Sequence, residues 1–216
     1  MMGLYFRILI PLLFLFFSTA WLSMNTEAFE EQSNTTLDSR VQTFLDSHDW
    51  RDMNIPSVDG QTMFDIIVEK GYTKALEIGT STGHSGIWIA WALSKTGGKL
   101  VTIDIDERRY RQALKNFEAA GVSQFIDARL GDAHKLVPEL EGPFDFVFSD
   151  ADKSWYKNYL IAVLPKLEIG GCYTTHNVSR RGWNSSYVDF LFSLNNLDTT
   201  IDSRGGGLSI SYKKSE

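Results

Sequence analysis

One stretch of this chain, residues 74–106, restricts its fold more than any other. An apolar run at 75–78 leads into a glycine-rich turn, a helical segment follows, and a second apolar run at 99–104 ends in Asp104. In this order the turn lets backbone N–H groups approach a ligand, and the acid can hold ribose hydroxyls. The stretch therefore predicts a site for a nucleotide-type cofactor.

The spacing of the glycines indicates which cofactor. They fall at Gly79, Gly83 and Gly86, which differs from the G-x-G-x-x-G pattern of dinucleotide sites, and Glu77 lies two residues before the first of them. A carboxylate at this position repels a pyrophosphate and suits a cation. S-adenosylmethionine (SAM), with its ammonium and sulfonium groups, is such a ligand, and we expect it as the cofactor.

Strands and helices alternate along the rest of the chain. We expect helices at 37–47, 61–69, 84–94, 107–120 and 155–164, and strands at 75–78, 99–104, 125–130, 144–149, 171–175, 198–202 and 208–212. Such alternation predicts an α/β fold with ligands at the carboxyl ends of the strands. The last two strands are joined by a short turn and must be antiparallel to each other. The expectation is a Rossmann-like, mostly parallel seven-stranded sheet, with an antiparallel C-terminal strand and helices on both faces.

Composition narrows the possible functions. The 216 residues carry a net charge of -6, so no general basic surface is available for nucleic acid. Cys172 is the only cysteine, which excludes an intrachain disulfide, and we interpret it as a small apolar residue of a strand.

The N-terminus predicts export or membrane attachment. Arg7 precedes the apolar run 8–17, small residues follow at 18–20, and acids dominate the next segment. This pattern is typical of a secretory signal or a short membrane anchor over 1–24, followed by a polar linker at 25–36 and a folded domain at 37–216. The acidic flank places the domain outside the membrane. The alternative is a cytoplasmic protein translated from Met24, which agrees with the cytoplasmic synthesis of SAM.

Several short motifs together carry a resemblance to a known family. They are Leu76-Glu-Ile-Gly-Thr-Ser-Thr-Gly-His-Ser85, Thr102-Ile-Asp104, Gly131-Asp-Ala133, Asp150-Ala-Asp-Lys153 with Tyr156 and Tyr159, and Gly170-Gly171 before Asn177-Val178. With them the chain resembles, from about residue 53 to 214, the small cation-dependent catechol and caffeoyl-CoA O-methyltransferases. The resemblance implies methyl transfer from SAM to a hydroxyl of a small, aromatic, catechol-like acceptor. It also implies a homodimer, since family members often dimerise.

The resemblance assigns five residues to the methionine end of the cofactor. Glu77 would pair with the ammonium group. Gly79, Thr80 and Gly83 belong to the turn whose backbone would cradle this moiety. Ser85, at the start of the next helix, would hydrogen-bond the carboxylate, whose charge a helix N-terminus favours. Ser85 is equally compatible with an ordinary helix-start role.

Further positions would hold the nucleoside end. Asp104 would bind both ribose hydroxyls, Asp132 and Ala133 would border the adenine, and Ile55 would close over the cofactor. Asp132 can also serve as a helix N-cap, which is compatible with binding.

The resemblance implies that Asp150 both borders the cofactor and ligates a divalent metal, while Lys153 acts as the base. In the family the metal binds both oxygens of a vicinal diol on an aromatic ring and lowers their pKa. An ordinary lysine, with a pKa of about 10.4, is a poor base at neutral pH, so a nearby cation would have to lower its pKa. The competing interpretation of Lys153 is a solvated lysine at a helix start.

The chain departs from the family at His176-Asn177, where the family usually carries Asp-Asn. Three interpretations remain open. His176 ligates a metal with Asp150 and Asn177, which would favour Mn²⁺, Fe²⁺ or Zn²⁺ over Mg²⁺. Alternatively the metal is lost and His176 is itself a general base. In the third interpretation His176 is a hydrogen-bonded structural residue of an inert site.

Two other functions compete with methyl transfer. A SAM-binding protein without catalysis fits the substitution at His176, and a nicotinamide-dependent oxidoreductase fits the fold but not the glycine spacing. Around the site we interpret His134 as a surface histidine. His84, in the glycine turn, either lines the cofactor pocket or is a plain residue of that turn. Residues 179–187 would form a lid or acceptor wall.

Overall fold

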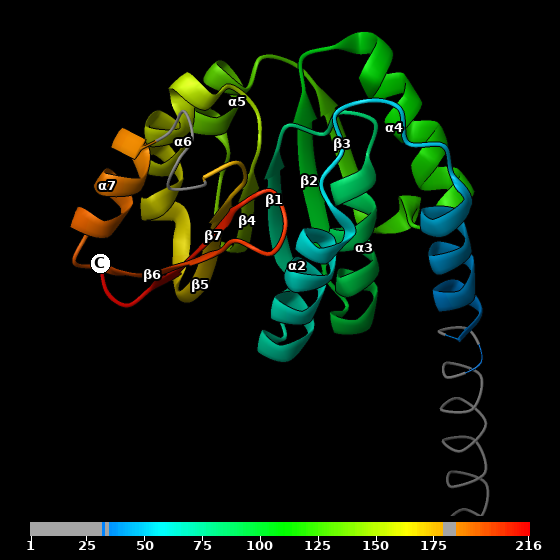
Figure 1. The fold of residues 1–216 in the computed structure, drawn as a ribbon, viewed down its shortest axis with the longest axis horizontal. Coiled ribbons are helices and arrows are strands. Elements are labelled where there is room, and N and C mark those ends of the chain that lie inside the picture. Colours follow the sequence, from blue (N-terminus) through cyan, green and yellow to red (C-terminus); the bar gives the residue numbers. More distant parts are fainter. Residues whose placement is uncertain (1–31, 33–34, 179–184) are drawn as a thin grey trace, which may run out of the picture. The chain divides into compact units, whose positions relative to one another are not determined.

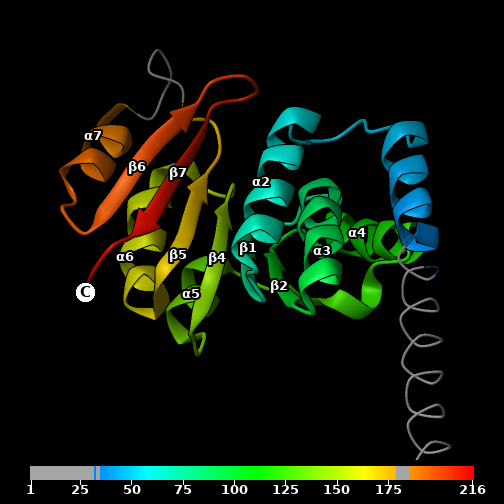
Figure 2. The ribbon, with the colours of Figure 1, turned by 90° about the horizontal axis from the view of Figure 1, so that it is seen from below.

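A seven-stranded sheet forms the centre of the protein (Figures 1 and 2). The computed structural model describes residues 32, 35–178 and 185–216, and residues from 41 onward form one compact unit that contains the sheet. The strands are β1 (Lys74–Ile78), β2 (Lys99–Asp104), β3 (Ile126–Leu130), β4 (Phe144–Ser149), β5 (Leu167–Thr175), β6 (Leu197–Asp202) and β7 (Leu208–Lys213). Their order is β3-β2-β1-β4-β5-β7-β6; β7 is antiparallel to both of its neighbours, β5 and β6, and the other neighbouring pairs of this sheet are parallel. This confirms the predicted fold class.

The helices match most of the expected ones. They are α2 (Ser57–Lys70), α3 (His84–Thr96), α4 (Glu107–Ala120), α5 (Ala133–Glu139), α6 (Tyr156–Val163) and α7 (Ser185–Ser193), with 3₁₀ turns at Ser123–Phe125, Lys153–Trp155 and Leu164–Lys166. A further helix covers 35–47. Helices α5 and α7 were not predicted, and α2 begins four residues before its predicted start, at Ser57.

Each face of the sheet carries its own hydrophobic core because side chains alternate between the faces along a strand. Leu76 and Ile78 of β1 pack in the core that includes residues of α5, α6 and α7. Ala75 of β1 and Phe146 and Phe148 of β4 pack in the core that includes residues of α2 and α3. Figures 1 and 2 show the two groups of helices on opposite faces of the sheet. The ends of the strands are thus left free for a site.

Local signals explain why the best-predicted helix lies where it does. The Asp106 carboxylate accepts a hydrogen bond of 3.0 Å from the Arg109 N–H at the start of α4. Gly121 ends α4 in the left-handed conformation, with φ of 81°.

The predictions for the N-terminus fall mainly outside the described residues. Residues 1–31 and 33–34, which contain the expected signal or anchor and most of the expected linker, are not described, and neither are 179–184 of the expected lid. Within the described part of the chain, no helix is long and apolar enough to span a membrane.

Candidate active site

A cavity of about 590 Å³ lies at the carboxyl ends of β1, β2, β4 and β5. This is the edge at which a parallel α/β sheet binds its ligands. Of the residues assigned from the sequence, the structure brings these to the cavity wall: Ile55, Gly79, Thr80, Ser85, Asp104, Asp132, Ala133, Asp150, Lys153, His176 and Asn177. Glu77 and Gly83 are the two assigned residues that do not line it.

The turn after β1 brings its backbone close to β2 and β4. The Gly79 and Thr80 N–H groups donate to the Ile103 carbonyl at 3.0 and 3.2 Å. Gly79 has φ of 104°, and a Cβ there would lie 2.6 Å from the Asp150 carbonyl oxygen, so only glycine fits. Ser81 is also left-handed, with φ of 50°, and its buried hydroxyl has no hydrogen-bond partner among the described residues. The wall here therefore consists of backbone and a free hydroxyl.

The carboxylate of Asp104 is held in one orientation at the end of β2. It accepts hydrogen bonds from the Ser81 N–H at 2.6 Å and from the Asp106 N–H at 2.8 Å. Each oxygen accepts one of these bonds and keeps a further lone pair that can accept another.

The side chain of Glu77 does not line the cavity, although we expected it to contact the cofactor directly. On β1 it points to the face covered by α2 and α3, where it is fully buried, and it accepts hydrogen bonds from Ser85 and from Thr102, the latter at 2.5 Å. Burial raises the pKa of its carboxyl group to about 8. Strand alternation explains the difference, because Glu77 faces the helix layer instead of the open end of the sheet.

Gly83 serves packing and does not reach the cavity. It precedes α3 with φ of 92°, and a Cβ there would lie 2.6 Å from the ring of Phe117. This close approach lets α3 pack against α4.

His134, which we expected to be a surface histidine, has a side chain that is 32% exposed and that also lines the cavity. Its ring stacks on Trp155, with centroids 3.8 Å apart and planes 12° apart, and Tyr159 lies at 5.7 Å. Asp132 caps α5 by accepting from the His134 N–H at 3.0 Å. An aromatic wall therefore stands beside the predicted adenine residues.

The loop before α2 is fixed over the cavity by ion pairs that the sequence did not suggest. Asp52 pairs with Arg108 and Arg109 of α4, at 3.1 and 3.3 Å. The Met53 N–H and Arg109 hold the pKa of the Asp52 carboxyl at about 2. The neighbouring Ile55 is buried and lines the cavity.

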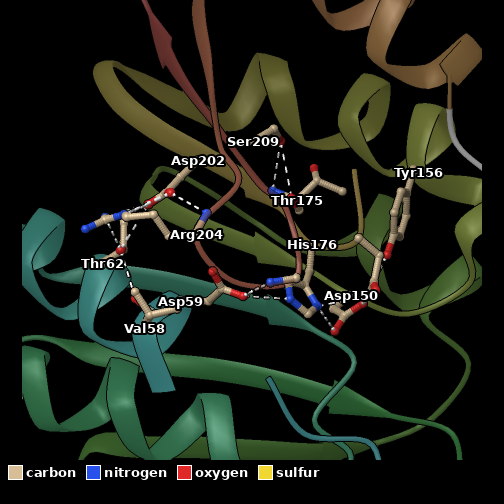
Figure 3. A network of polar contacts seen from close by, with 12 residues as sticks. Val58, Asp59, Thr62, Asp150, Tyr156, Thr175, His176, Asp202, Arg204 and Ser209 are labelled. Carbon is tan, nitrogen blue, oxygen red and sulfur yellow. Dashed lines mark hydrogen bonds and ion pairs between the residues drawn. The ribbon is translucent and has the colours of Figure 1, made fainter. Parts of the chain in front are cut away.

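The most unusual feature of the site is a histidine between two carboxylates (Figure 3). His176 Nδ1 lies 3.0 Å from Asp150 Oδ2, and His176 Nε2 lies 3.0 Å from Asp59 Oδ2. The Asn177 amide also contacts Nδ1, at 2.9 Å. Burial by itself would lower the pKa of the imidazole, but the bonds to Asp150 and Asp59 outweigh it and raise the pKa to about 9.

Asp59 is the site residue that sequence reasoning missed. It is 0% exposed and also accepts from the Gly206 N–H at 2.8 Å. A signal was present: Asp59 lies on the same helical stripe as the buried Met63, Ile66 and Ile67, at positions i, i+4, i+7 and i+8. An acid on a buried stripe needs a partner.

The residues at the expected metal position do not fit a divalent cation. Asp150 Oδ1 accepts from Tyr156 and from Asn177, both at 3.1 Å, and Oδ2 faces His176. Both oxygens of Asp150 and Nδ1 of His176 thus already contact protein groups. Among the side chains described, no group of three His, Cys, Asp or Glu residues has the arrangement of a metal site.

Lys153 is an exposed cation of the cavity wall. It begins the 3₁₀ turn after β4, is exposed, and lines the cavity close in sequence to Asp150. Asp152 starts this turn by accepting from the Ser154 N–H at 2.9 Å.

Comparison with known proteins shows the family to which the chain is similar. The sequence pattern of a family described as O-methyltransferase matches residues 27–189. Caffeoyl-CoA O-methyltransferase 1 of Zea mays is 36% identical over 147 residues, which cover 65% of this chain and 55% of the relative. Catechol O-methyltransferase of Niastella koreensis is 39% identical over 111 residues, half of each chain. The chain spans about half the length of these curated relatives.

Solved structures share the fold. An O-methyltransferase from Bacillus cereus in complex with SAH aligns with a TM-score of 0.65 and 23% identity, over 83% of this chain and 91% of that one. The O-methyltransferase TomG from Streptomyces achromogenes, in complex with SAM, aligns with a TM-score of 0.66 and 22% identity, over 82% and 89%.

Proposed function

Because the chain belongs to the O-methyltransferase family, we propose that it transfers a methyl group from SAM to a hydroxyl group of a small aromatic acceptor. The charge of the cavity wall carries this proposal. Four carboxylates line it, from Asp104, Asp132, Asp150 and Asp152, against the side chains of Arg109, Lys153 and His176. Such a wall favours a cationic ligand over a pyrophosphate.

The observed wall suits the parts of SAM. The glycine turn and the free Ser81 hydroxyl offer polar contacts for the methionine end, near the N-terminus of α3. Asp104 offers its remaining lone pairs to the ribose, and the layer around His134 offers apolar contact to the adenine. The bound cofactor supplies a methyl group already activated on a sulfonium.

The protein's own residues would orient the acceptor and take its proton. Lys153 lies at the open side of the cavity, where its amine, when neutral, can accept the proton of an acceptor hydroxyl. Holding the hydroxyl oxygen in line with the methyl group can contribute about 7–11 kcal/mol. The acceptor class rests on the names of the relatives, which are catechol and caffeoyl-CoA O-methyltransferases.

Calorimetry followed by product analysis tests this function. We expect the protein to bind SAM and to methylate a member of a panel of catechols and caffeoyl thioesters. Lys153→Ala should lower turnover by about 10²–10⁴-fold with SAM affinity unchanged. Lys157→Ala, an exposed lysine of α6, is the matched control and should keep full turnover.

Two outcomes would contradict the proposal. Binding of SAM without turnover on any member of the panel would indicate a binding protein without catalysis. Binding of NADH in place of SAM would indicate an oxidoreductase.

We also propose that residues 1–24 export or anchor the domain, as the apolar run 8–17 and the small residues after it suggest. Expression of the full chain with mass measurement and membrane fractionation tests this. A chain that keeps Met1 and does not sediment with membranes would contradict it. The homodimer stays a prediction from the resemblance.

A further inference from the structure

The ring of His176 joins three separate parts of the chain. His176 follows β5, Asp150 follows β4, and Asp59 lies in the first turn of α2 (Figure 3). Both ring nitrogens lie 3.0 Å from a carboxylate oxygen, one on each side. His176 is 4% exposed and Asp59 is 0% exposed, so the bond between them is shielded from water, whereas Asp150, whose side chain is 22% exposed, faces the cavity.

This arrangement determines what the ring nitrogens can do. A neutral imidazole has one N–H and one lone pair, and the lone pair would face a carboxylate oxygen at 3.0 Å, which is repulsive. With both carboxyl groups ionised, both contacts are hydrogen bonds only when both nitrogens carry a proton. The Asn177 amide nitrogen, which lies 2.9 Å from Nδ1, donates to Asp150 Oδ1 at 3.1 Å and does not need Nδ1 as an acceptor. A nitrogen that carries a proton has no lone pair in the ring plane for a metal, since metals bind the neutral imidazole.

We propose that the His176 ring, bonded to Asp59 and Asp150, takes the place of a divalent cation in this site. The protein then holds Asp150 with a positive group of its own and binds no divalent cation there. The ring would act neither as a metal ligand nor as a general base, which differs from two of the three interpretations left open by the sequence.

The surroundings of Asp59 support this role. Besides His176, Asp59 Oδ2 accepts only the Gly206 N–H in the described part of the chain, and Asp59 Oδ1 has no hydrogen-bond partner there. A buried carboxylate with so few partners is costly unless it faces a cation. Gly205 and Gly206 allow the close approach, because a Cβ at Gly205 would overlap the Asp59 carboxylate and one at Gly206 would overlap His176 Nε2.

If the proposed methyl transfer holds, one consequence concerns the acceptor. No cation bridges its two oxygens, so deprotonation depends on Lys153 and turnover persists in EDTA. This consequence rests on the proposed function. The cation-binding test below does not, because it measures metal occupancy in the absence of SAM and acceptor.

Titration with Mn²⁺, followed by electron paramagnetic resonance of the free ion, tests the proposal. We expect the wild-type full chain to show no stoichiometric site at up to 1 mM Mn²⁺, on the order of the upper range of weak protein sites. His176→Asp replaces the ring by a third carboxylate beside Asp59 and Asp150. It should gain a site at least about tenfold tighter than any wild-type binding. His176→Asn, which adds no carboxylate, is the matched control and should gain none.

The Mn²⁺ titration of the wild-type chain tests the proposal even if a variant fails to fold. One Mn²⁺ per wild-type chain, lost in Asp150→Asn, would overturn the proposal. A folded His176→Asp that binds no Mn²⁺ would also contradict it, because Asp150 would then not be placed to share a cation. Absence of methyl transfer with the expected Mn²⁺ results would disprove the proposed function alone.

Discussion

Two buried acidic side chains, Asp59 and Glu77, are accommodated in the folded protein in different ways. Asp59 faces the His176 ring at 3.0 Å, so another side chain balances its charge. Among the residues that the structure describes, no cation lies beside Glu77, and burial raises its pKa to about 8, so it keeps its proton at neutral pH. Its Oε1 has no hydrogen-bond partner in the same part of the chain, which fits a protonated group better than an anion. The two acids thus require different tests.

Glu77→Gln should stabilise the protein at pH 7.5 and have little effect at pH 4. The folded-state pKa lies above the ordinary 4.5, so the stabilising contribution of Glu77 is fully present below pH 4.5 and is lost as the pH rises through 8. Glutamine does not ionise, so the variant does not lose this stability as the pH rises. The melting temperature at both pH values measures the difference, and each kcal/mol should change it by about 2–4 °C.

The control for this prediction is Glu139→Gln, an exposed glutamate of α5. It should change the melting temperature by the same small amount at both pH values. If Glu77→Gln lowers the melting temperature at pH 7.5, the carboxyl group is ionised in the folded protein and its hydrogen bonds require that charge.

At the scale of elements, the loop between β6 and β7 packs against α2 through glycines. A Cβ at Gly205 would overlap the Asp59 carboxylate, although Gly205 does not have a positive φ. Gly205→Ala should therefore lower the free energy of unfolding by about 1–3 kcal/mol, as overpacking does. Ser203→Ala, exposed in the same loop, is the control and should lie within about 0.5 kcal/mol of the wild type. Equal stability of both variants, measured in urea, would contradict the packing argument.

The sequence predicted those elements whose ends carry chemical signals. Strands β2 and β4 and helix α4 agree with the prediction to the residue, because an acid, a cap or a glycine bounds each apolar pattern. Helix α5 was missed because it has seven residues, contains Pro138 and buries only Val137. The start of α2 was missed because its first turn, Ser57 to Gly60, shows little apolar pattern.

The site residues that could be predicted from the sequence are those at the end of a strand or in the turn that follows it. Asp104, Asp150 and Lys153 end strands or begin turns at one edge of the sheet, and the structure brings them to one cavity. The bond between Asp59 and His176 joins residues 117 positions apart, and no periodicity connects them. The contact of Glu77 with the cofactor stays a prediction, since its side chain is buried on the α2 and α3 face of β1 and does not line the cavity.

At the scale of the whole molecule, the cavity is completed by a segment from outside the sheet. The strand ends form its floor, while the loop before α2 supplies Met53, Asn54 and Ile55 to its wall. In the described part of the chain, the ion pairs of Asp52 with Arg108 and Arg109 connect this loop to α4. The side chains of these pairs are exposed or half-exposed. Such pairs contribute about 0–1 kcal/mol each. They therefore matter more for the position of the loop than for the stability of the fold.

Asp52→Asn should weaken binding of SAH by up to about tenfold and leave the unliganded melting temperature nearly unchanged. The stabilising contribution of the Asp52 carboxyl is present above its ordinary pKa of 3.8 and is lost as the pH falls through about 2. The effect on affinity should thus be constant between pH 6 and 8. Asp127→Asn, which breaks an exposed pair with Arg129 on β3, is the control and should leave affinity unchanged. Equal affinity of Asp52→Asn and wild type by calorimetry would show that the loop holds its position over the cavity without these ion pairs.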